Sequence, residues 1–76
     1  FAQPNPFSDA TTLFFSNPNA SPANITVTDM TGRIMRSYQN IRDEEITITR
    51  GNLTAGIYLF TIRTNTGAVS GKIMVK

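Results

Sequence analysis

The stretch Gly56-Ile57-Tyr58-Leu59-Phe60-Thr61-Ile62 decides the fold. Its residues alternate in character with a period of two, which is typical of a β-strand with two different faces. One face would carry Tyr58, Phe60 and Ile62. The following Asn65-Thr66-Gly67 has the composition of a short turn, and the chain then returns from Val69 to Lys76. This part of the sequence predicts an antiparallel hairpin.

The rest of the chain favours short strands as well. Turn-forming residues recur about every ten positions, and no segment has the periodicity of a helix of useful length. We expect seven strands, over Phe1–Phe7, Thr11–Ser16, Ala23–Asp29, Arg33–Tyr38, Ile46–Thr49, Gly56–Ile62 and Val69–Lys76. The predicted fold is all-β, an immunoglobulin-like antiparallel β-sandwich. The paired Cys around a Trp that mark immunoglobulin domains are absent, so the prediction concerns architecture and not ancestry.

Several single residues carry local expectations. Pro4 and Pro6 lack backbone donors, which places the first segment at a sheet edge. Asp29-Met30-Thr31-Gly32 predicts a tight turn, since Asp can bond a nearby backbone N–H and Gly can adopt a positive φ. Leu53 is the only large apolar residue of its loop and is expected to plug one end of the core. Gly71 suggests a β-bulge in the closing strand.

Composition limits the function. The 76 residues make one small domain without His or Cys, and no nucleophile elbow or phosphate loop is present. The only acidic cluster, Asp43-Glu44-Glu45, is interpreted as a solvated loop. A weak calcium site there, with oxygen from Asn40, is the less favoured alternative, because the ligand spacing is not evident. We therefore expect no enzyme activity, no catalytic or metal-binding residues and no cofactor.

Charge and hydropathy limit the kinds of partner that the chain is expected to bind. The net charge is +2, and the seven Lys and Arg are scattered along the chain, which argues against nucleic acid as a partner. No apolar run is long enough to cross a bilayer, so membrane insertion is not expected. The chain has no initiator Met and no signal segment at its start, and we expect it to be a fragment of a longer secreted precursor.

Four short motifs occur in a fixed order. They are Pro4-Asn5-Pro6-Phe7, Asp29-Met30-Thr31-Gly32-Arg33-Ile34, Leu53-Thr54-Ala55-Gly56-Ile57-Tyr58 and Gly71-Lys72-Ile73-Met74-Val75-Lys76. Each is weak alone, but the ordered set, closed by a basic and apolar strand, resembles the C-terminal sorting domain of the type IX secretion system of Bacteroidetes-type bacteria. The resemblance covers essentially residues 1–76 as a single domain. Members of the family often have an aromatic or aliphatic residue before the first Pro, whereas this chain has Gln3.

The resemblance implies a function in transport. In that family the domain follows an N-terminally linked cargo, which crosses the periplasm and is directed as a folded protein through the outer-membrane translocon to the cell surface or the medium. In many members a sortase-like cysteine peptidase then removes the domain, and the cargo is anchored at the surface. The implied partners are translocon components, the peptidase and the cargo.

The resemblance also suggests roles for residues. The residues of the first three motifs would be structural, namely Pro4, Asn5, Pro6, Phe7, Asp29, Gly32, Leu53, Gly56 and Tyr58. The candidate translocon recognition segment is the closing one, Gly71, Lys72, Ile73, Met74, Val75 and Lys76. Lys72 and Lys76 would be exposed, with Ile73 and Val75 either buried or offered to the translocon.

Two alternatives from other classes remain. An accessory sandwich that binds carbohydrate or protein would need exposed aromatic residues, for which Phe14 and Tyr38 are the candidates. A structural spacer of the fibronectin type III kind would be followed by further domains after Lys76.

Overall fold

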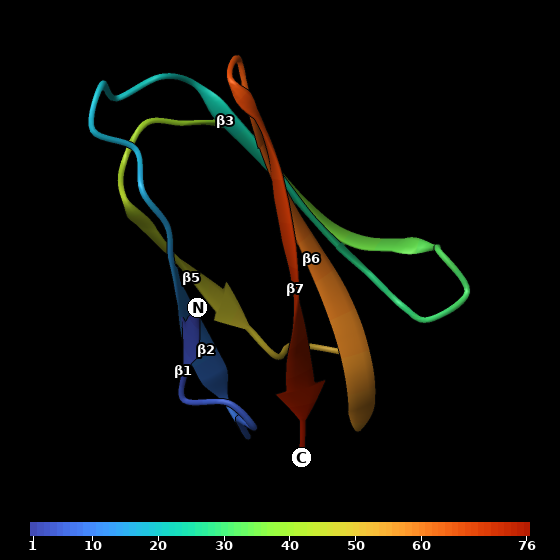
Figure 1. The fold of residues 1–76 in the computed structure, drawn as a ribbon. Helices are drawn as coiled ribbons and strands as arrows, with labels where there is room; N and C mark the ends of the chain where they lie inside the picture. The colour runs from blue at the N-terminus through green and yellow to red at the C-terminus, as the bar shows by residue number, and fades with distance from the viewer.

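Two antiparallel sheets pack face to face in the computed structural model, which describes all residues 1–76 (Figure 1). The smaller sheet has the order β1-β2-β5 and the larger one the order β4-β3-β6-β7. The strands are β1 (Ala2–Gln3), β2 (Ala10–Phe14), β3 (Ala23–Thr28), β4 (Ile34–Ile41), β5 (Glu45–Thr49), β6 (Gly56–Thr64) and β7 (Gly67–Val75). The predicted seven-stranded β-sandwich is confirmed. No helix long and apolar enough to span a bilayer occurs.

The strand order differs from that of a constant-type immunoglobulin domain in one respect. In that type the fourth strand joins the sheet of the first two, whereas here β4 pairs with β3. Four strands therefore face three. The β3–β4 hairpin extends beyond the smaller sheet, at the right of Figure 1.

The core lies between the sheets and is built by alternation. In β6 the side chains of Tyr58, Phe60 and Ile62 share one face, as predicted, and this face is buried; in β3 the side chains of Ile25 and Val27 are buried. Because successive side chains of a strand point to opposite faces, the positions between these residues point away from the core. The twelve members of the core are Phe7, Leu13, Ala23, Ile25, Val27, Ile48, Leu53, Tyr58, Phe60, Ile62, Ile73 and Val75.

Both predicted turns are present. β6 and β7 are joined by the two residues Asn65 and Thr66, with Thr64 opposite Gly67. In the β3–β4 turn the N–H of Gly32 donates to the carbonyl of Asp29 at 3.1 Å, and Gly32 has a φ of 92°. That φ lies in the region that glycine adopts without steric cost, which explains the residue type at this position.

The prediction of one strand over Phe1–Phe7 is wrong. Only Ala2–Gln3 pair with β2, at the edge of the smaller sheet. After Pro4 and Pro6 the chain reaches the other sheet, where Phe7 makes an isolated parallel bridge to Val75. The segment is thus divided between the two sheets, and the prolines lie between its two pairing sites.

The prediction of a β-bulge at Gly71 is also wrong, because the β6–β7 register runs without interruption from Gly56↔Val75 to Thr64↔Gly67. Gly71 is needed for another reason. A Cβ atom at this position would lie 2.5 Å from Cζ of Phe60, so the ring of Phe60 occupies the space that any other side chain would require.

Candidate recognition surface

The last strand presents a mixed surface. In β7 the side chains of Ile73 and Val75 are buried, while those of Lys72 and Met74 are exposed, and so is the following Lys76. Gly71 is half-buried beneath the ring of Phe60. The six residues of the candidate recognition segment therefore separate into three core-facing positions and three solvent-facing ones.

The outer edge of this strand is covered by the Pro4–Phe7 segment. The side chain of Asn5 bonds two backbone groups of β7: its Nδ2 donates to the carbonyl of Lys72 at 3.2 Å, and its Oδ1 accepts from the N–H of Met74 at 2.8 Å. Phe7 continues the pattern with its own backbone, since its N–H donates to the carbonyl of Met74 at 3.0 Å and its carbonyl accepts from the N–H of Lys76 at 2.9 Å. The segment thus closes an edge that would otherwise offer free donors and acceptors.

Sequence reasoning assigned Asn5 a structural role without finding this contact. The signal was present in the residue type, because an Asn side chain carries a donor and an acceptor at the spacing of a peptide group. The partner strand lies almost seventy residues away, however, and nothing in the local pattern identifies it.

The remaining motif residues are held by the core and by local bonds. The carbonyl of Pro4 accepts from the Thr11 hydroxyl at 2.6 Å. Leu53 is buried, as predicted, and the hydroxyl of Tyr58 donates to the carbonyl of Thr54 at 2.8 Å. Gly56 begins β6. These contacts agree with the structural roles expected for these residues. Their roles in the function of the domain stay predictions.

The side chain of Asp29 accepts hydrogen bonds from other residues of the β3–β4 turn. Its Oδ1 accepts from the Thr31 hydroxyl at 2.6 Å and from the backbone N–H groups of Thr31 and Arg33 at 2.9 and 3.0 Å. The Thr31 hydroxyl bond is the main cause that lowers the pKa of this carboxyl below its ordinary value of 3.8. The Arg33 guanidinium lies 3.4 Å from Oδ2. The turn is therefore stabilised by a charged carboxylate.

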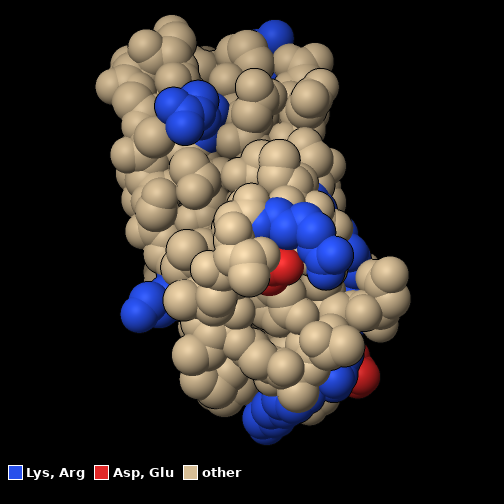
Figure 2. All heavy atoms as spheres, turned by 90° about the vertical axis from the view of Figure 1, so that its right-hand side faces the viewer, with Lys and Arg blue, Asp and Glu red and all other residues tan.

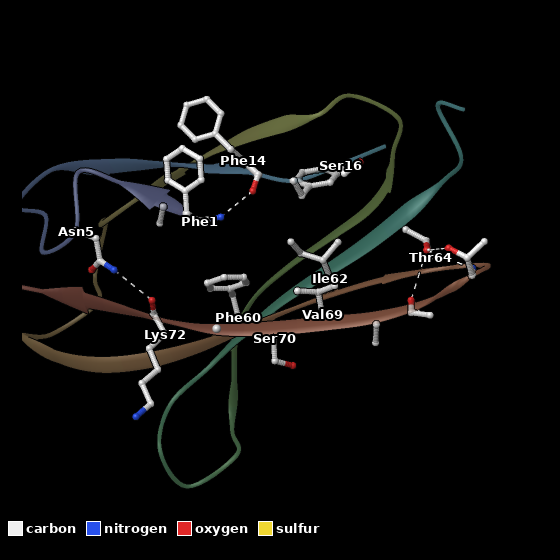
Figure 3. A pocket seen from close by; sticks show the side chains of 16 residues that line it. Phe1, Asn5, Phe14, Ser16, Phe60, Ile62, Thr64, Val69, Ser70 and Lys72 are labelled. Atoms are coloured by element: carbon white, nitrogen blue, oxygen red, sulfur yellow. Dashed lines mark hydrogen bonds between the residues drawn. The ribbon is translucent and has the colours of Figure 1, made fainter. Parts of the chain in front are cut away.

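A cavity opens beside the first half of β7 (Figure 3). Its volume is about 780 Å³, and it lies between the two sheets. Phe60, Ile62 and Val69 contribute from the larger sheet, Ala2 from β1 of the smaller one, and Phe15 from the residues that follow β2. Lys72 is the only Lys, Arg, Asp or Glu among the lining residues, and its side chain points away from the cavity (Figure 3). Sequence reasoning did not find this cavity.

The other residues considered as sites are not brought together. Phe14 stacks on Phe1 with ring centroids 5.1 Å apart, whereas Tyr38 lies on β4 in the other sheet. The two aromatic candidates for carbohydrate binding therefore do not share a face. Asp43-Glu44-Glu45 is exposed, and no group of three or more acidic side chains is arranged to hold a metal ion.

The charged side chains of one face can be followed in a space-filling view. Figure 2 shows the basic side chains of one face in several separate groups, with acidic atoms beside two of them. No continuous basic surface is visible on this face.

The sequence matches a model of a known protein family. The model described as secretion system C-terminal sorting domain matches residues 2–76. The chain belongs to this family. The match runs from β1 to Lys76, so all four motifs lie within the sorting domain. A search of curated proteins gives no match.

Family membership fixes the general function. Sorting domains of this family are signals for type IX secretion, and the family is non-catalytic. Such a signal implies recognition by the secretion machinery, a cargo on its N-terminal side and export to the cell surface or beyond.

Proposed function

We propose that residues 1–76 form one domain at the C-terminal end of a longer exported protein, and that the translocon recognises the exposed side chains of β7 and of the following Lys76. The cargo precedes Phe1 and passes through the periplasm. A sortase-like cysteine peptidase then removes the domain and the cargo is anchored at the surface, as in many members of the family.

One observation supports the proposal most directly. Lys72, Met74 and Lys76 occupy alternate positions of an edge strand and face solvent, whereas the residues between them are buried. A row of alternating exposed side chains is the form in which a strand presents specific contacts. Two cations flank an apolar thioether in this row, so the fitting receptor surface is acidic with an apolar centre.

The burial pattern also determines how the proposal must be tested. Deletion of residues 72–76 removes Ile73 and Val75 from the core and would unfold the domain, so that loss of export would have no clear meaning. Substitutions of Lys72 and Lys76 to Ala leave the core intact. Arg63→Ala is the matched control, because Arg63 is also an exposed cation of the larger sheet and makes no side-chain hydrogen bond.

The experiment fuses residues 1–76 to a signal-peptide-bearing fluorescent reporter in a bacterium with a type IX system and in its translocon-null strain. The expected result is surface or medium localisation in the competent strain alone, lost with Lys72→Ala/Lys76→Ala and kept with Arg63→Ala. A reporter that stays in the periplasm of both strains, with the domain intact, would refute the sorting function. Export unaffected by the double substitution would refute the role of the two lysines.

A further inference from the structure

The edge of β7 is covered over only half of its length. Lys72, Met74 and Lys76 direct backbone groups away from β6 and toward Asn5 and Phe7. Backbone groups of an antiparallel strand alternate with a period of two, so Ala68 and Ser70 direct theirs to the same side. No segment of the chain pairs with them there, because residues 2 and 3 pair with β2 instead.

The core-facing side of β7 next to this open edge borders the cavity and is not closely packed. Val69 is paired with the buried Ile62, and paired residues point to the same face of a sheet. Val69 therefore belongs to the core face, yet its side chain is 65% exposed and lines the cavity. Figure 3 shows Phe60 and Ile62 pointing into the cavity, while the Phe1 and Phe14 rings point away from it.

We propose that the Ala68–Ser70 edge and the adjoining cavity bind one extended strand of a partner protein by β-strand addition. The strand would bond the backbone groups of Ala68 and Ser70, and its alternate side chains would enter the cavity over Val69. These inward side chains are apolar. Lys72 points to the opposite face of the sheet (Figure 3), so an acidic residue would fit on the outward face of the added strand, at the end near Lys72. The inference rests on the proposed function and deepens it. The partner would contact the backbone of β7 at Ala68 and Ser70 in addition to the exposed side chains of Lys72, Met74 and Lys76.

A second copy of this chain is a poorer occupant. The strand of a second copy has the same covered half, in which the Lys72 carbonyl is already bonded to Asn5. An antiparallel pair centred on Ser70 would place each covered half against the open half of the other copy. A partner strand without a covered half does not have this difficulty.

Two variants isolate the site without touching the core. Ser70→Pro removes the outward N–H at the centre of the open edge and leaves the β6–β7 ladder in place, because Ser70 does not bond β6 through its backbone. Val69→Asp puts a charge into the cavity. Ile34→Asp is the matched control, since Ile34 is an apolar residue of the same sheet, 61% exposed and distant from the cavity lining.

The first test measures amide hydrogen exchange of the isolated domain with a synthetic heptapeptide of alternating Val and Thr that ends in Asp. At saturating peptide we expect exchange at Ala68 and Ser70 to slow by about tenfold, the factor given by about 1.4 kcal/mol. Val69→Asp and Ser70→Pro should abolish the effect, and Ile34→Asp should keep it. Unchanged exchange in the native domain, or protection at other strands only, would overturn the inference. Protection that depends on protein concentration without peptide would also overturn it, in favour of a second copy.

The second test places the same variants in the reporter fusion. Reduced export of Ser70→Pro and Val69→Asp, with Ile34→Asp exported normally, would support the inference. Normal export of all three, together with export of the native fusion, would overturn it while the sorting function stands. Failure of the native fusion would refute the sorting function. The peptide measurement would still test whether the Ala68–Ser70 edge binds an extended strand.

Discussion

Oδ1 of Asn5 accepts a hydrogen bond from the backbone N–H of Met74 at 2.8 Å, across 69 positions of the sequence. Nδ2 of the same side chain donates to the carbonyl of Lys72. One side chain thus takes the place of a peptide group beside the last strand, and the first motif covers the strand that carries the last motif.

Asn5→Ala should destabilise the domain by about 1 to 2 kcal/mol, because two hydrogen bonds are lost at a partly solvated edge where water replaces them in part. Urea unfolding measures the change, and exchange of the Met74 amide should accelerate. Asn19→Ala is the control, since Asn19 is exposed and makes no side-chain hydrogen bond. Equal stability of the two variants would show that the edge cover contributes nothing.

Gly71→Ala should cost about 1 to 3 kcal/mol, since the new methyl group overlaps the Phe60 ring and forces it to move. Ser70→Ala, one position earlier on the outward face, should change stability by less than about 0.5 kcal/mol. A double-mutant cycle with Phe60→Leu should give a coupling of about 0.5 kcal/mol or more. Additive effects would contradict the contact.

Leu53→Ala should cost about 2 to 5 kcal/mol, because the side chain is buried in a loop that closes one end of the core. Ile57→Ala removes a branched side chain that is 41% exposed and should cost much less. Thermal unfolding followed by circular dichroism compares them. Similar melting temperatures would mean that Leu53 does not fill the core.

Asp29 should make the stability of the β3–β4 hairpin depend on pH. Its folded-state pKa is lowered, so the carboxylate contributes stability above its ordinary value of 3.8, and this contribution is lost as the pH falls through the folded-state pKa. Asp29→Asn should therefore be less stable than the native domain at pH 7, and the difference should vanish at low pH. A difference that is constant from neutral to acidic pH would contradict this origin.

The predictable parts of the fold are those that depend on neighbours in sequence. The alternation of Tyr58, Phe60 and Ile62, the turn at Asn65-Thr66 and the Asp29 turn all follow from local rules, and the structure confirms them. The burial of Leu53 also follows, because the only large apolar side chain of a polar loop is more stable in the core than in water.

The parts that sequence reasoning missed depend on distant neighbours. The division of the first segment is decided by which strand each residue meets, and Phe7 meets Val75 across most of the chain. Gly71 was interpreted as a bulge, whereas its residue type is explained by the ring of Phe60, which lies opposite it on the neighbouring strand β6. Val69 is on the core-facing side of β7 and is nevertheless exposed, which the alternation within β7 does not indicate.

The parallel bridge between Phe7 and the last strand has a mechanical consequence. A tension applied between the two ends of the chain draws these neighbouring segments lengthwise past each other, so the bonds from Asn5 and Phe7 to β7 are loaded together. Antiparallel neighbours pulled from adjacent ends would instead open one bond at a time. The two ends of the domain are thus joined in shear geometry, so a lengthwise pull has to break these bonds together.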